Sequence, residues 1–339
     1  MIYFLLYILF IYILFYFINT YLKTNIEHYE GMSTDSFFKE LNKKKYTIDY
    51  DKKTVTYCID DNNCDTKTYA KHFNTPESII HAKNKILTSK TLSDANIPIP
   101  KYLNINLSNN TKTIKELIKY NNITYPVVIK PINGTFGRDV LTDIESIEEL
   151  DDSLQFMRNK YKNVMLEEQI AGDCYRIFIF NNNVIDIIKR EKPYVIGNGV
   201  NTIKELIDMR NIEQIDMKLF EVKNISEIVI KKQNETLVSI PDDGKKIFIS
   251  NVINMHNGAR ISRIPIDTVP QKNIDLFLNV NKAMNITCSG LDYLSEDICI
   301  EYDLNNSRIL EVNGTPDTEI HGKIKNYNFF EKIVNSIFN

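Results

Sequence analysis

The sequence lacks an excess of basic residues. It contains 41 Lys and Arg against 44 Asp and Glu, which gives a formal net charge of −3. Proteins that bind nucleic acid need a basic surface to release counterions from the phosphates, so this composition argues against a nucleic-acid partner. The length of 339 residues and the hydrophobic content of 43% predict one large enzyme domain, or two of ordinary size, with a buried core.

Cysteines are few, and none forms a CxxC pair. The five residues are Cys58, Cys64, Cys174, Cys288 and Cys299. An odd number of cysteines without metal-ligand spacing fits reduced thiols better than a disulfide framework. We therefore expect a reducing compartment.

Internal repeats are absent, and so is any low-complexity linker after residue 75. Strand and helix patterns alternate instead, which predicts a single α+β catalytic unit of mixed sheets. Strands or extended stretches are predicted at 101–105, 126–130, 164–169, 176–180 and 184–189, with a hairpin turn at 181–183, and near 291, 298 and 309–313. Helices are predicted at 112–120 and 273–284, after the capping boxes Ser146-x-x-Glu149 and Thr202-x-x-Glu205, and after His321.

The first 18 residues are all Met, Ile, Tyr, Phe or Leu. At a rise of about 1.5 Å per residue, such a helix approaches the roughly 30 Å thickness of a bilayer core. A cleaved signal peptide is one alternative, but the segment has no basic n-region and no small-x-small cleavage site. A buried core helix is another, and it would need partner surfaces on all sides. We expect an uncleaved transmembrane anchor over residues 1–22.

Lys23 follows the apolar segment, so the positive-inside rule places the bulk of this single-pass membrane protein in the cytosol. Residues 23–75 form a small polar N-terminal region in which short alternating stretches, such as Thr54 to Cys58, predict a small sheet. The catalytic domain is expected over residues 76–339.

A helix is predicted to begin at Thr75-Pro76-Glu77, which supplies an N-cap residue, a proline at the first helical position and an acid in the first turn. Its apolar side would include Ile79, Ile80, Ile86 and Leu87. We expect it to end near residue 96.

A glycine-containing loop follows the apolar residues 127–129 and runs from Lys130 to Arg138. Backbone N–H groups in such a loop form an anion-binding concavity, to which Lys130 would add a positive charge. The loop matches neither GxxxxGK[ST] nor GxGxxG, and the alternative is a surface turn with a solvated Lys. As an exposed side chain, Lys130 is expected to contribute little to stability.

Near the C-terminus, Glu311 and Asn313 alternate with Leu310 and Val312. In a strand, the first two would share one face and the second two the other. Carboxylate and amide oxygens are ligands that Mg²⁺ prefers, and Asp292 could supply a second carboxylate. The alternative is an ordinary solvated strand face.

A third segment runs from Met165 to Gly172 and is followed by Arg176. A strand that stops at a glycine leaves backbone groups free to bond an adenine edge, and an acid there can accept from the adenine amino group. This pattern carries little information by itself.

Taken in their order along the chain, these segments resemble the ATP-grasp superfamily and, within it, the ligase domain of cyanophycin synthetase and bifunctional glutathione synthetase. The resemblance covers residues 76–339 and implies an ATP-grasp fold, in which two α+β subdomains clamp ATP. The segments that carry it are Asn84-Lys85 with Ser89-Lys90, Val127-Val128-Ile129-Lys130-Pro131 with Gly134 and Gly137, Glu167 to Gly172 with Arg176, Arg190 with Val195-Ile196-Gly197-Asn198-Gly199, Asn254 to Gly258, Ser289-Gly290-Leu291-Asp292, Glu311-Val312-Asn313 with Pro316, and His321.

The resemblance also implies roles for individual residues. Two lysines and a loop would hold the nucleotide phosphates: Lys85, Lys130 and Gly134. Adenine would be held by Glu167 and by the backbone of Gln169 and Ile170. Magnesium would be carried by Asp292, Glu311 and Asn313. The transferring phosphoryl group or the substrate carboxylate would be faced by Arg176, Arg190 and Asn254.

Three positions depart from the family pattern. Asn84 and Asn198 stand where the family usually has Asp, and Cys174 stands where it has an acid that binds the ribose hydroxyls. Asp173, one residue earlier, is the candidate to replace that acid.

The implied activity is an ATP- and Mg²⁺-dependent ligation, with Mn²⁺ as an alternative metal. A carboxylate, from an amino acid or a short peptide, would attack the γ-phosphate to give an acyl phosphate, which an amine then captures. Two other functions stay open: a membrane-anchored nucleotide-binding module without turnover, and an ATP-dependent phosphotransferase.

Overall fold

The protein is described here from a computed structural model. The structure describes residues 46–49, 54–60, 63–68, 74–134, 137–216, 221–223, 225–251, 253, 258–305, 307–322 and 329–338.

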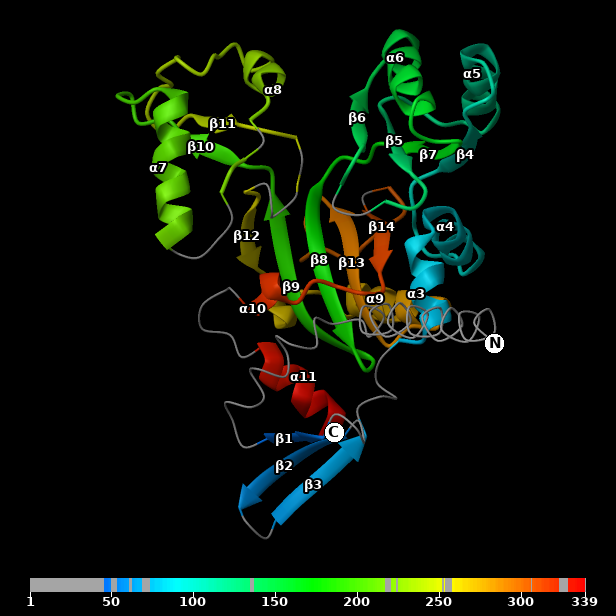
Figure 1. Cartoon of the computed structure of the whole chain (residues 1–339), viewed down its shortest axis with the longest axis vertical. Helices are drawn as coiled ribbons and strands as arrows, with labels where there is room; N and C mark the ends of the chain where they lie inside the picture. Colours follow the sequence, from blue (N-terminus) through cyan, green and yellow to red (C-terminus); the bar gives the residue numbers. More distant parts are fainter. Residues whose placement is uncertain are drawn as a thin grey trace, which may run out of the picture.

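A five-stranded antiparallel sheet lies at the centre of the molecule, in the order β12-β9-β8-β13-β14 (Figure 1). Its strands are β8 (Asp173–Phe180), β9 (Asn183–Glu191), β12 (Arg260–Arg263), β13 (Cys288–Ser295) and β14 (Ser307–Asn313). The predicted hairpin between β8 and β9 is confirmed. Asn181 and Asn182 make its turn with φ angles of 47° and 60°, a region that Asn enters more readily than most residues.

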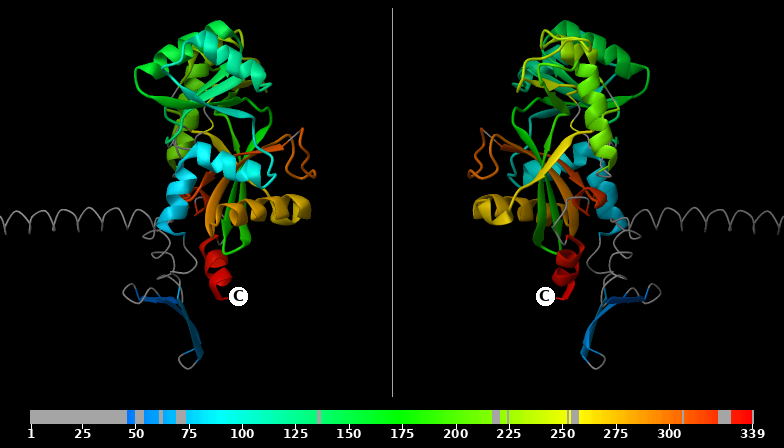
Figure 2. Two further views of the ribbon diagram at one scale, coloured as in Figure 1. Left: turned by 90° about the vertical axis from the view of Figure 1, so that its right-hand side faces the viewer. Right: turned by 90° about the vertical axis from the view of Figure 1, so that its left-hand side faces the viewer.

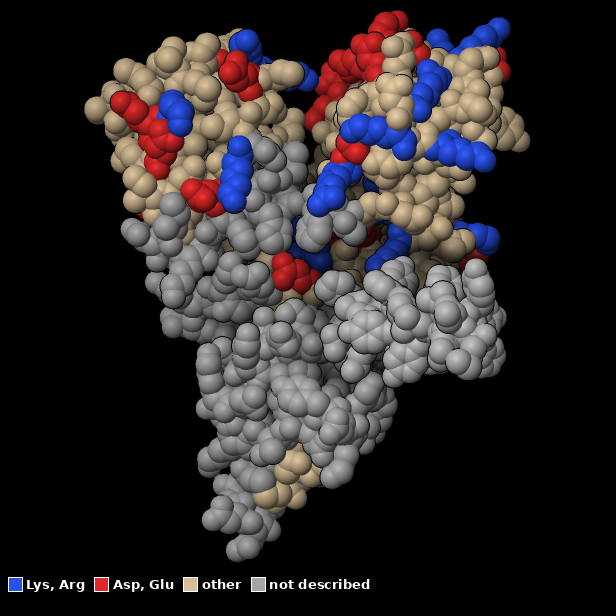
Figure 3. All heavy atoms as spheres, viewed as in Figure 1, with Lys and Arg blue, Asp and Glu red and all other residues tan. Residues whose placement is uncertain are grey.

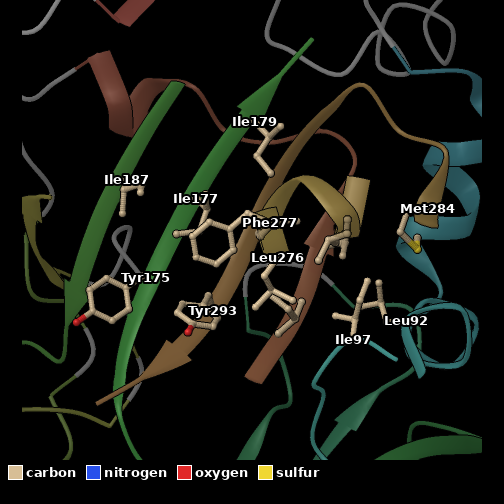
Figure 4. Packing of buried hydrophobic residues seen from close by; sticks show 14 of the residues in the cluster. Leu92, Ile97, Tyr175, Ile177, Ile179, Ile187, Leu276, Phe277, Met284 and Tyr293 are labelled. Atoms are coloured by element: carbon tan, nitrogen blue, oxygen red, sulfur yellow. The ribbon is translucent and has the colours of Figure 1, made fainter. Parts of the chain in front are cut away.

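One face of this sheet is mostly apolar. Tyr175, Ile177 and Ile179 of β8 pack against helix α9 (Gln271–Met284), which projects from that side of the sheet (Figures 2 and 4). The Phe277 ring of α9 meets the Tyr293 ring edge-on, with 5.0 Å between the centroids. Because strand side chains alternate, the β8 residues that lie between Tyr175, Ile177 and Ile179 in the sequence point to the opposite face of the sheet. The charged side chains, such as Arg176, lie on that face.

A second sheet has four antiparallel strands in the order β4-β7-β5-β6. Its elements are β4 (Tyr102–Asn106), β5 (Val127–Pro131), β6 (Leu141–Ile144), β7 (Asn163–Glu168), and the helices α5 (Thr111–Tyr120) and α6 (Ile147–Arg158). The Ser146 capping box is confirmed, since its Oγ accepts from Glu149 N–H at 3.2 Å.

The expectation of mixed sheets is wrong for the described strands, because every pair among them is antiparallel. The helix α5 does connect β4 to β5. However, these two strands do not pair with each other, because β7 lies between them and runs antiparallel to both.

A small lobe follows β9. It contains β10 (Tyr194–Ile196), β11 (Lys246–Phe248), α7 (Ile203–Asp216) and α8 (Glu227–Lys231). The second capping box is confirmed by two reciprocal bonds, Glu205 N to Thr202 Oγ1 and Thr202 N to Glu205 Oε2. Gly197 is needed where it stands, because a Cβ there would lie 2.2 Å from the Asp242 carbonyl oxygen.

The small lobe and the four-stranded sheet stand on either side of a hollow above the central sheet (Figure 3). The two lobes are joined by a hydrogen bond of 3.0 Å from Asn251 Nδ2 to Asp143 Oδ2. Asn251 follows β11 and Asp143 lies on β6, so the contact links two elements far apart in the sequence. This arrangement confirms the α+β fold that the resemblance implies.

The single helix predicted from residue 75 to 96 is in fact two helices, α3 (Pro76–Lys83) and α4 (Lys85–Asp94). The break lies at Asn84, whose side chain accepts from two backbone N–H groups of α4 and caps it. The break changes which residues are buried: Ile79 is fully buried, whereas Ile80 and Leu87 are exposed. The predicted apolar side was therefore half wrong.

A bulge in β14 corrects the predicted core residues of that strand. Val312 is 1% exposed, as expected, but its neighbour in the core is Ile309, also 1% exposed, and not Leu310. The register shifts between Asp292 and Tyr293, so that Leu310 is an extra residue on β14. The predicted placement of Glu311 and Asn313 on the face opposite Val312 is unaffected.

The remaining elements are short. Near the C-terminus they are a 3₁₀ turn η3 (Ile266–Thr268), α10 (Glu319–Gly322) and α11 (Phe329–Phe338). Near the N-terminus the predicted small sheet is confirmed by three antiparallel strands, β1 (Tyr46–Asp49), β2 (Thr54–Asp60) and β3 (Asn63–Thr68).

The expectation of reduced thiols is wrong for Cys64, which is disulfide-bonded. Cys58 is the residue directly opposite it across the β2–β3 pair. Three other cysteines are free, namely Cys174, Cys288 and Cys299.

The predicted anchor over residues 1–22 lies outside the described residues. Within the described part of the chain, no helix combines the length and the apolar character needed to cross a membrane.

Candidate active site

The charged face of the central sheet is centred on Asp292. Its carboxylate oxygen Oδ1 lies 2.9 Å from Arg176 Nε and 2.8 Å from Arg190 Nη2. Arg176 is the cross-strand partner of Asp292, and Arg190 comes from the next strand, β9. Burial opposes ionisation of Asp292, but the two guanidinium groups outweigh it and hold the pKa of its carboxyl below the usual value.

Gly290 makes room for Arg176. A Cβ at this position would lie 2.5 Å from Arg176 Nη1 and 3.2 Å from its Cδ. Glycine therefore lets the Arg176 side chain lie flat across β13.

Cys174 lies beside Arg190 on the same face. Its Sγ accepts a hydrogen bond of 3.0 Å from Arg190 Nη2, and the side chain is buried. Burial raises the pKa of the Cys174 thiol despite the nearby guanidinium, so the group stays protonated at neutral pH. At this departure from the family pattern, the structure has a packed thiol in contact with an arginine.

Three oxygen donors converge next to this cluster. Asp292 and Glu311 are direct cross-strand partners, and Asn313 is the partner of Gly290, so all three side chains share one face. Asn313 donates through Nδ2 to the Gly290 carbonyl, which leaves its amide oxygen available. Two carboxylates and one amide suit a hard divalent cation that keeps other positions for water and phosphate. The described residues hold no larger cluster of His, Cys, Asp and Glu that would suit a metal ion.

Lys85 connects this face to the glycine loop. Its Nζ lies 2.9 Å from Glu311 Oε1 and donates to the Gly134 carbonyl, also at 2.9 Å. The Asn84 cap fixes Lys85 at the first position of α4. The side chain therefore spans from the four-stranded sheet to the central sheet.

Lys130 and Glu167 form a buried ion pair on the four-stranded sheet. Lys130 Nζ lies 2.5 Å from Glu167 Oε1, and both side chains are less than 10% exposed. The expectation that Lys130 is exposed and unimportant for stability is therefore wrong, because its strand β5 is buried along its whole length. The second oxygen, Glu167 Oε2, is buried and has no hydrogen-bond partner among the described residues. An unpaired buried acceptor of this kind fits a ligand that donates a hydrogen bond.

Part of the chain matches a known family of protein domains. A family model for the RimK-like ATP-grasp domain matches residues 82–194. That segment contains Lys85, Lys130, Glu167 and the two arginines of the charged face.

Residues 82–194 belong to an ATP-grasp domain of the RimK-like kind.

Curated relatives of this ATP-grasp protein agree with the family model. It is 28% identical to cyanophycin synthetase of Trichormus variabilis over 249 residues, which cover 71% of the chain and 27% of that protein. It is also 28% identical to the glutathione biosynthesis bifunctional protein GshAB of Clostridium perfringens over 269 residues, which cover 76% of this chain and 34% of that protein. The chain thus spans only about a quarter to a third of the length of these relatives.

A crystal structure of a bifunctional glutathione synthetase from Pasteurella multocida has the same fold. It superimposes with a TM-score of 0.61 at 20% identity, covering 91% of this chain and 44% of that one. At this identity the likeness establishes the ATP-grasp fold and nothing finer.

Two other predicted site residues, Gln169 and Ile170, do not contact the charged face in the described part of the structure. The Gln169 side chain bonds both the backbone N–H and the carboxylate of Asp143 at the edge strand β6, and Gln169 N–H donates to the Pro126 carbonyl. Ile170 is half-buried just beyond the end of β7. Asn254 lies outside the described residues.

Asp173 is not brought to the charged face. Its Oδ2 lies 2.5 Å from Lys189 Nζ, whereas the neighbouring Cys174 contacts Arg190. Since adjacent strand residues point to opposite faces, Asp173 lies on the side away from Asp292. The suggested replacement of the family acid by Asp173 would require β8 to change register.

A second charged cluster of the ATP-grasp domain includes residues that sequence reasoning did not select. Asp186 on β9 accepts two bonds from Arg263, at 2.7 and 2.9 Å, and lies 2.7 Å from Nδ1 of His321. The His321 ring is fully buried, stacked on Phe329 and edge-on to Phe178. Asp186 could have been noticed as a lone acid within the apolar stretch of β9.

Proposed function

We propose that this protein is an ATP- and Mg²⁺-dependent ligase that joins a carboxylate to an amine. The observation that carries the proposal is the position of Lys85, whose ammonium group contacts both the Glu311 carboxylate and the Gly134 carbonyl. This side chain connects a loop suited to phosphates with a set of oxygen donors suited to a metal. Phosphoryl transfer requires such positioning and charge neutralisation, and it needs no covalent protein nucleophile.

When bound, ATP would supply the phosphoryl group for transfer to the substrate carboxylate with release of ADP, and attack of the amine on the resulting acyl phosphate would release inorganic phosphate. The metal would be held by Asp292, Glu311 and Asn313, with Mn²⁺ as a substitute for Mg²⁺. Arg176 and Arg190 would neutralise negative charge at the reacting groups.

The residues of the four-stranded sheet would bind the nucleotide. Lys130 and Lys85 offer positive charge to the phosphates next to Gly134. The unpaired oxygen of Glu167 would accept from the adenine amino group, and the backbone of Gln169 and Ile170 would complete the adenine site. The names of the relatives support an amino acid or a short peptide as the carboxylate substrate.

The test is ADP release by the full-length protein, with pairs of amino acids or short peptides as acid and amine. ADP release that requires both the acid and the amine supports the ligase function. Tight ATP binding without ADP release for any pair would favour a nucleotide-binding module. A stable phosphorylated acid that accumulates without an amine would favour a phosphotransferase.

We also propose that residues 1–22 anchor the protein in a membrane with the catalytic domain in the cytosol, where ATP is supplied. The full-length chain should then stay with membranes after high-salt and alkaline washing, and recovery in the soluble fraction would contradict the anchor. Disulfides persist mainly in oxidising compartments, so the cytosolic orientation requires Cys64 to be reduced in cells. Thiol labelling without prior reduction tests this, and a blocked Cys64 would contradict the orientation.

A further inference from the structure

Three basic side chains contact the two carboxylates of the candidate metal site. Lys85 Nζ lies 2.9 Å from Glu311 Oε1. The other carboxylate, Asp292, has its Oδ1 atom 2.9 Å from Arg176 Nε and 2.8 Å from Arg190 Nη2. Apart from Glu311, none of these side chains is more than 14% exposed. Solvent therefore screens these charges less than it screens charges on the protein surface.

The charges in contact at this site do not balance. Three cations face two carboxylates, which leaves an excess of one positive charge, and none of the three pairs with a further acid in the described part of the chain. The fully buried carboxylates nearby have cations of their own, since Glu167 is paired with Lys130 and Asp186 with Arg263. A free divalent cation would therefore meet a site that already carries excess positive charge.

The position of Lys85 is unfavourable for the helix that carries it. Lys85 is the first residue of α4, and the first turn of that helix contains no acid. The N-terminus of a helix has partial positive charge, which repels a lysine there. The ammonium group is held instead by the Glu311 carboxylate and the Gly134 carbonyl, each at 2.9 Å. A residue that local structure disfavours is typical of a functional site.

The charge of Lys85 acts on both carboxylates. Lys85 contacts Glu311 directly, and Asp292 is the cross-strand partner of Glu311. Burial raises the pKa of Asp292, but Arg176, Arg190 and Lys85 together hold it below its usual value. Two ionised carboxylates on neighbouring strands suit a divalent cation, yet Lys85 already occupies one of them. The ammonium group thus competes with a metal ion for Glu311.

We infer that Lys85 is an internal counter-ion that keeps free divalent cations out of the site formed by Asp292, Glu311 and Asn313. The metal then enters only together with a polyphosphate, whose negative charge draws the ammonium group away from Glu311 and offsets the excess positive charge. The inference rests on the proposed ligase function and adds a selectivity to it. Lys85 makes the site selective for the metal–nucleotide complex over the free metal.

The test is equilibrium dialysis of Mn²⁺ against the full-length protein without nucleotide. Lys85→Met should bind Mn²⁺ at least about tenfold more tightly than the wild type, because a positive charge beside the divalent ion is lost. Lys85→Arg keeps that charge and should bind as weakly as the wild type. Lys90→Met, on the exposed side of α4, is the matched control and should also bind weakly. A wild-type affinity equal to that of Lys85→Met would overturn the inference.

Two further measurements show where the metal binds and whether the variant is intact. The double variant Lys85→Met with Glu311→Gln should lose the Mn²⁺ binding that Lys85→Met gains, and retention of that binding would contradict the inference. Calorimetry with ADP should show the opposite change, since Lys85→Met removes a charge offered to the phosphates. Tighter Mn²⁺ binding with weaker ADP binding supports the counter-ion, whereas a loss of both would show a structural role and contradict it.

The wild-type protein alone gives an independent reading. Mn²⁺ binding should appear with ADP but not with adenosine, because only ADP carries the phosphates that draw Lys85 from Glu311. Equal Mn²⁺ binding with ADP, with adenosine and without either would overturn the inference and leave the ligase function standing. An absence of Mn²⁺ binding under every condition, ADP included, would instead remove the metal site and the proposed function with it.

Discussion

The two faces of the central sheet are made by the same five strands, yet they differ in almost every property. On one face Tyr175, Ile177 and Ile179 contact α9 and are excluded from water. On the other, Arg176 contacts Asp292. Residues one apart in the sequence therefore belong to different physical environments, the first governed by packing and the second by charge.

This difference implies that neighbouring substitutions should have separable effects. Changes on the α9 face should alter stability, and changes on the charged face should alter ligand binding and turnover. Changes to the buried ion pair of Lys130 and Glu167 should alter both stability and ligand binding. Removing one partner leaves a buried charge unpaired and also removes a group that would contact the nucleotide.

The largest effect is expected for Val312→Asp. Val312 is 1% exposed in the core next to α9, so the substitution would bury an unpaired carboxylate. We expect a loss of more than about 4 kcal/mol in the free energy of unfolding. Urea denaturation of the full-length protein measures it. A stable Val312→Asp protein would show that β14 does not present this face to the core.

Lys130→Met should cost about 3–5 kcal/mol, because it leaves the Glu167 carboxylate buried without its partner. The double variant Lys130→Met with Glu167→Leu removes both charges and should recover most of that stability, while ATP binding stays lost. Denaturation and calorimetry on the same samples separate the two effects. Equal destabilisation by the single and the double variant would contradict the role of the buried pair.

Glu311→Gln should lower turnover by about 100-fold or more and change stability by less than about 1 kcal/mol. It keeps the size and one oxygen of a half-exposed side chain but removes the charge that a divalent ion requires. Mg²⁺-dependent ADP release is the measurement, with Val312→Ala as a control for packing around the same strand. Normal Mg²⁺-dependent turnover in Glu311→Gln would remove β14 from the metal site.

The smallest effect concerns His321 and pH. Burial lowers its pKa below the usual 6.5 despite the opposing charge of Asp186, and Arg176 and Arg263 add to the lowering. The unfolded chain therefore takes up a proton first as pH falls, so stability present above about pH 6.5 should decline, by at most about 1.4 kcal/mol per pH unit. Urea midpoints between pH 7.5 and 5.5 should show this slope, and His321→Gln should flatten it. An equal slope in the variant would assign the effect to other groups.

Much of the fold could be predicted from local signals. The capping boxes at Ser146 and Thr202 and the asparagine turn between β8 and β9 act through neighbouring residues, so the sequence shows them directly. The break at Asn84 was missed because a helical pattern continues through it, and only the cap geometry reveals the second helix.

The candidate site was predictable in its residue types but not in its pairings. The alternation of Glu311 and Asn313 with Val312 follows from strand period, whereas the bulge at Leu310 depends on the partner strand β13. Sequence reasoning likewise could not bury Lys130, because its ion-pair partner Glu167 is 37 residues away. Nor could it identify the pairing of Asp186 with His321, which are 135 residues apart.

The hydrogen bond between Asn251 and Asp143 has a consequence for how ligands enter. It joins the lobes on the two sides of the hollow, so a motion that widens the hollow must break it. A single hydrogen bond contributes a net of about 0.5–1.5 kcal/mol, which corresponds to a shift of roughly two- to tenfold in the ratio of closed to open molecules. Asn251→Ala would therefore increase the open population, and ligands would both arrive and leave faster.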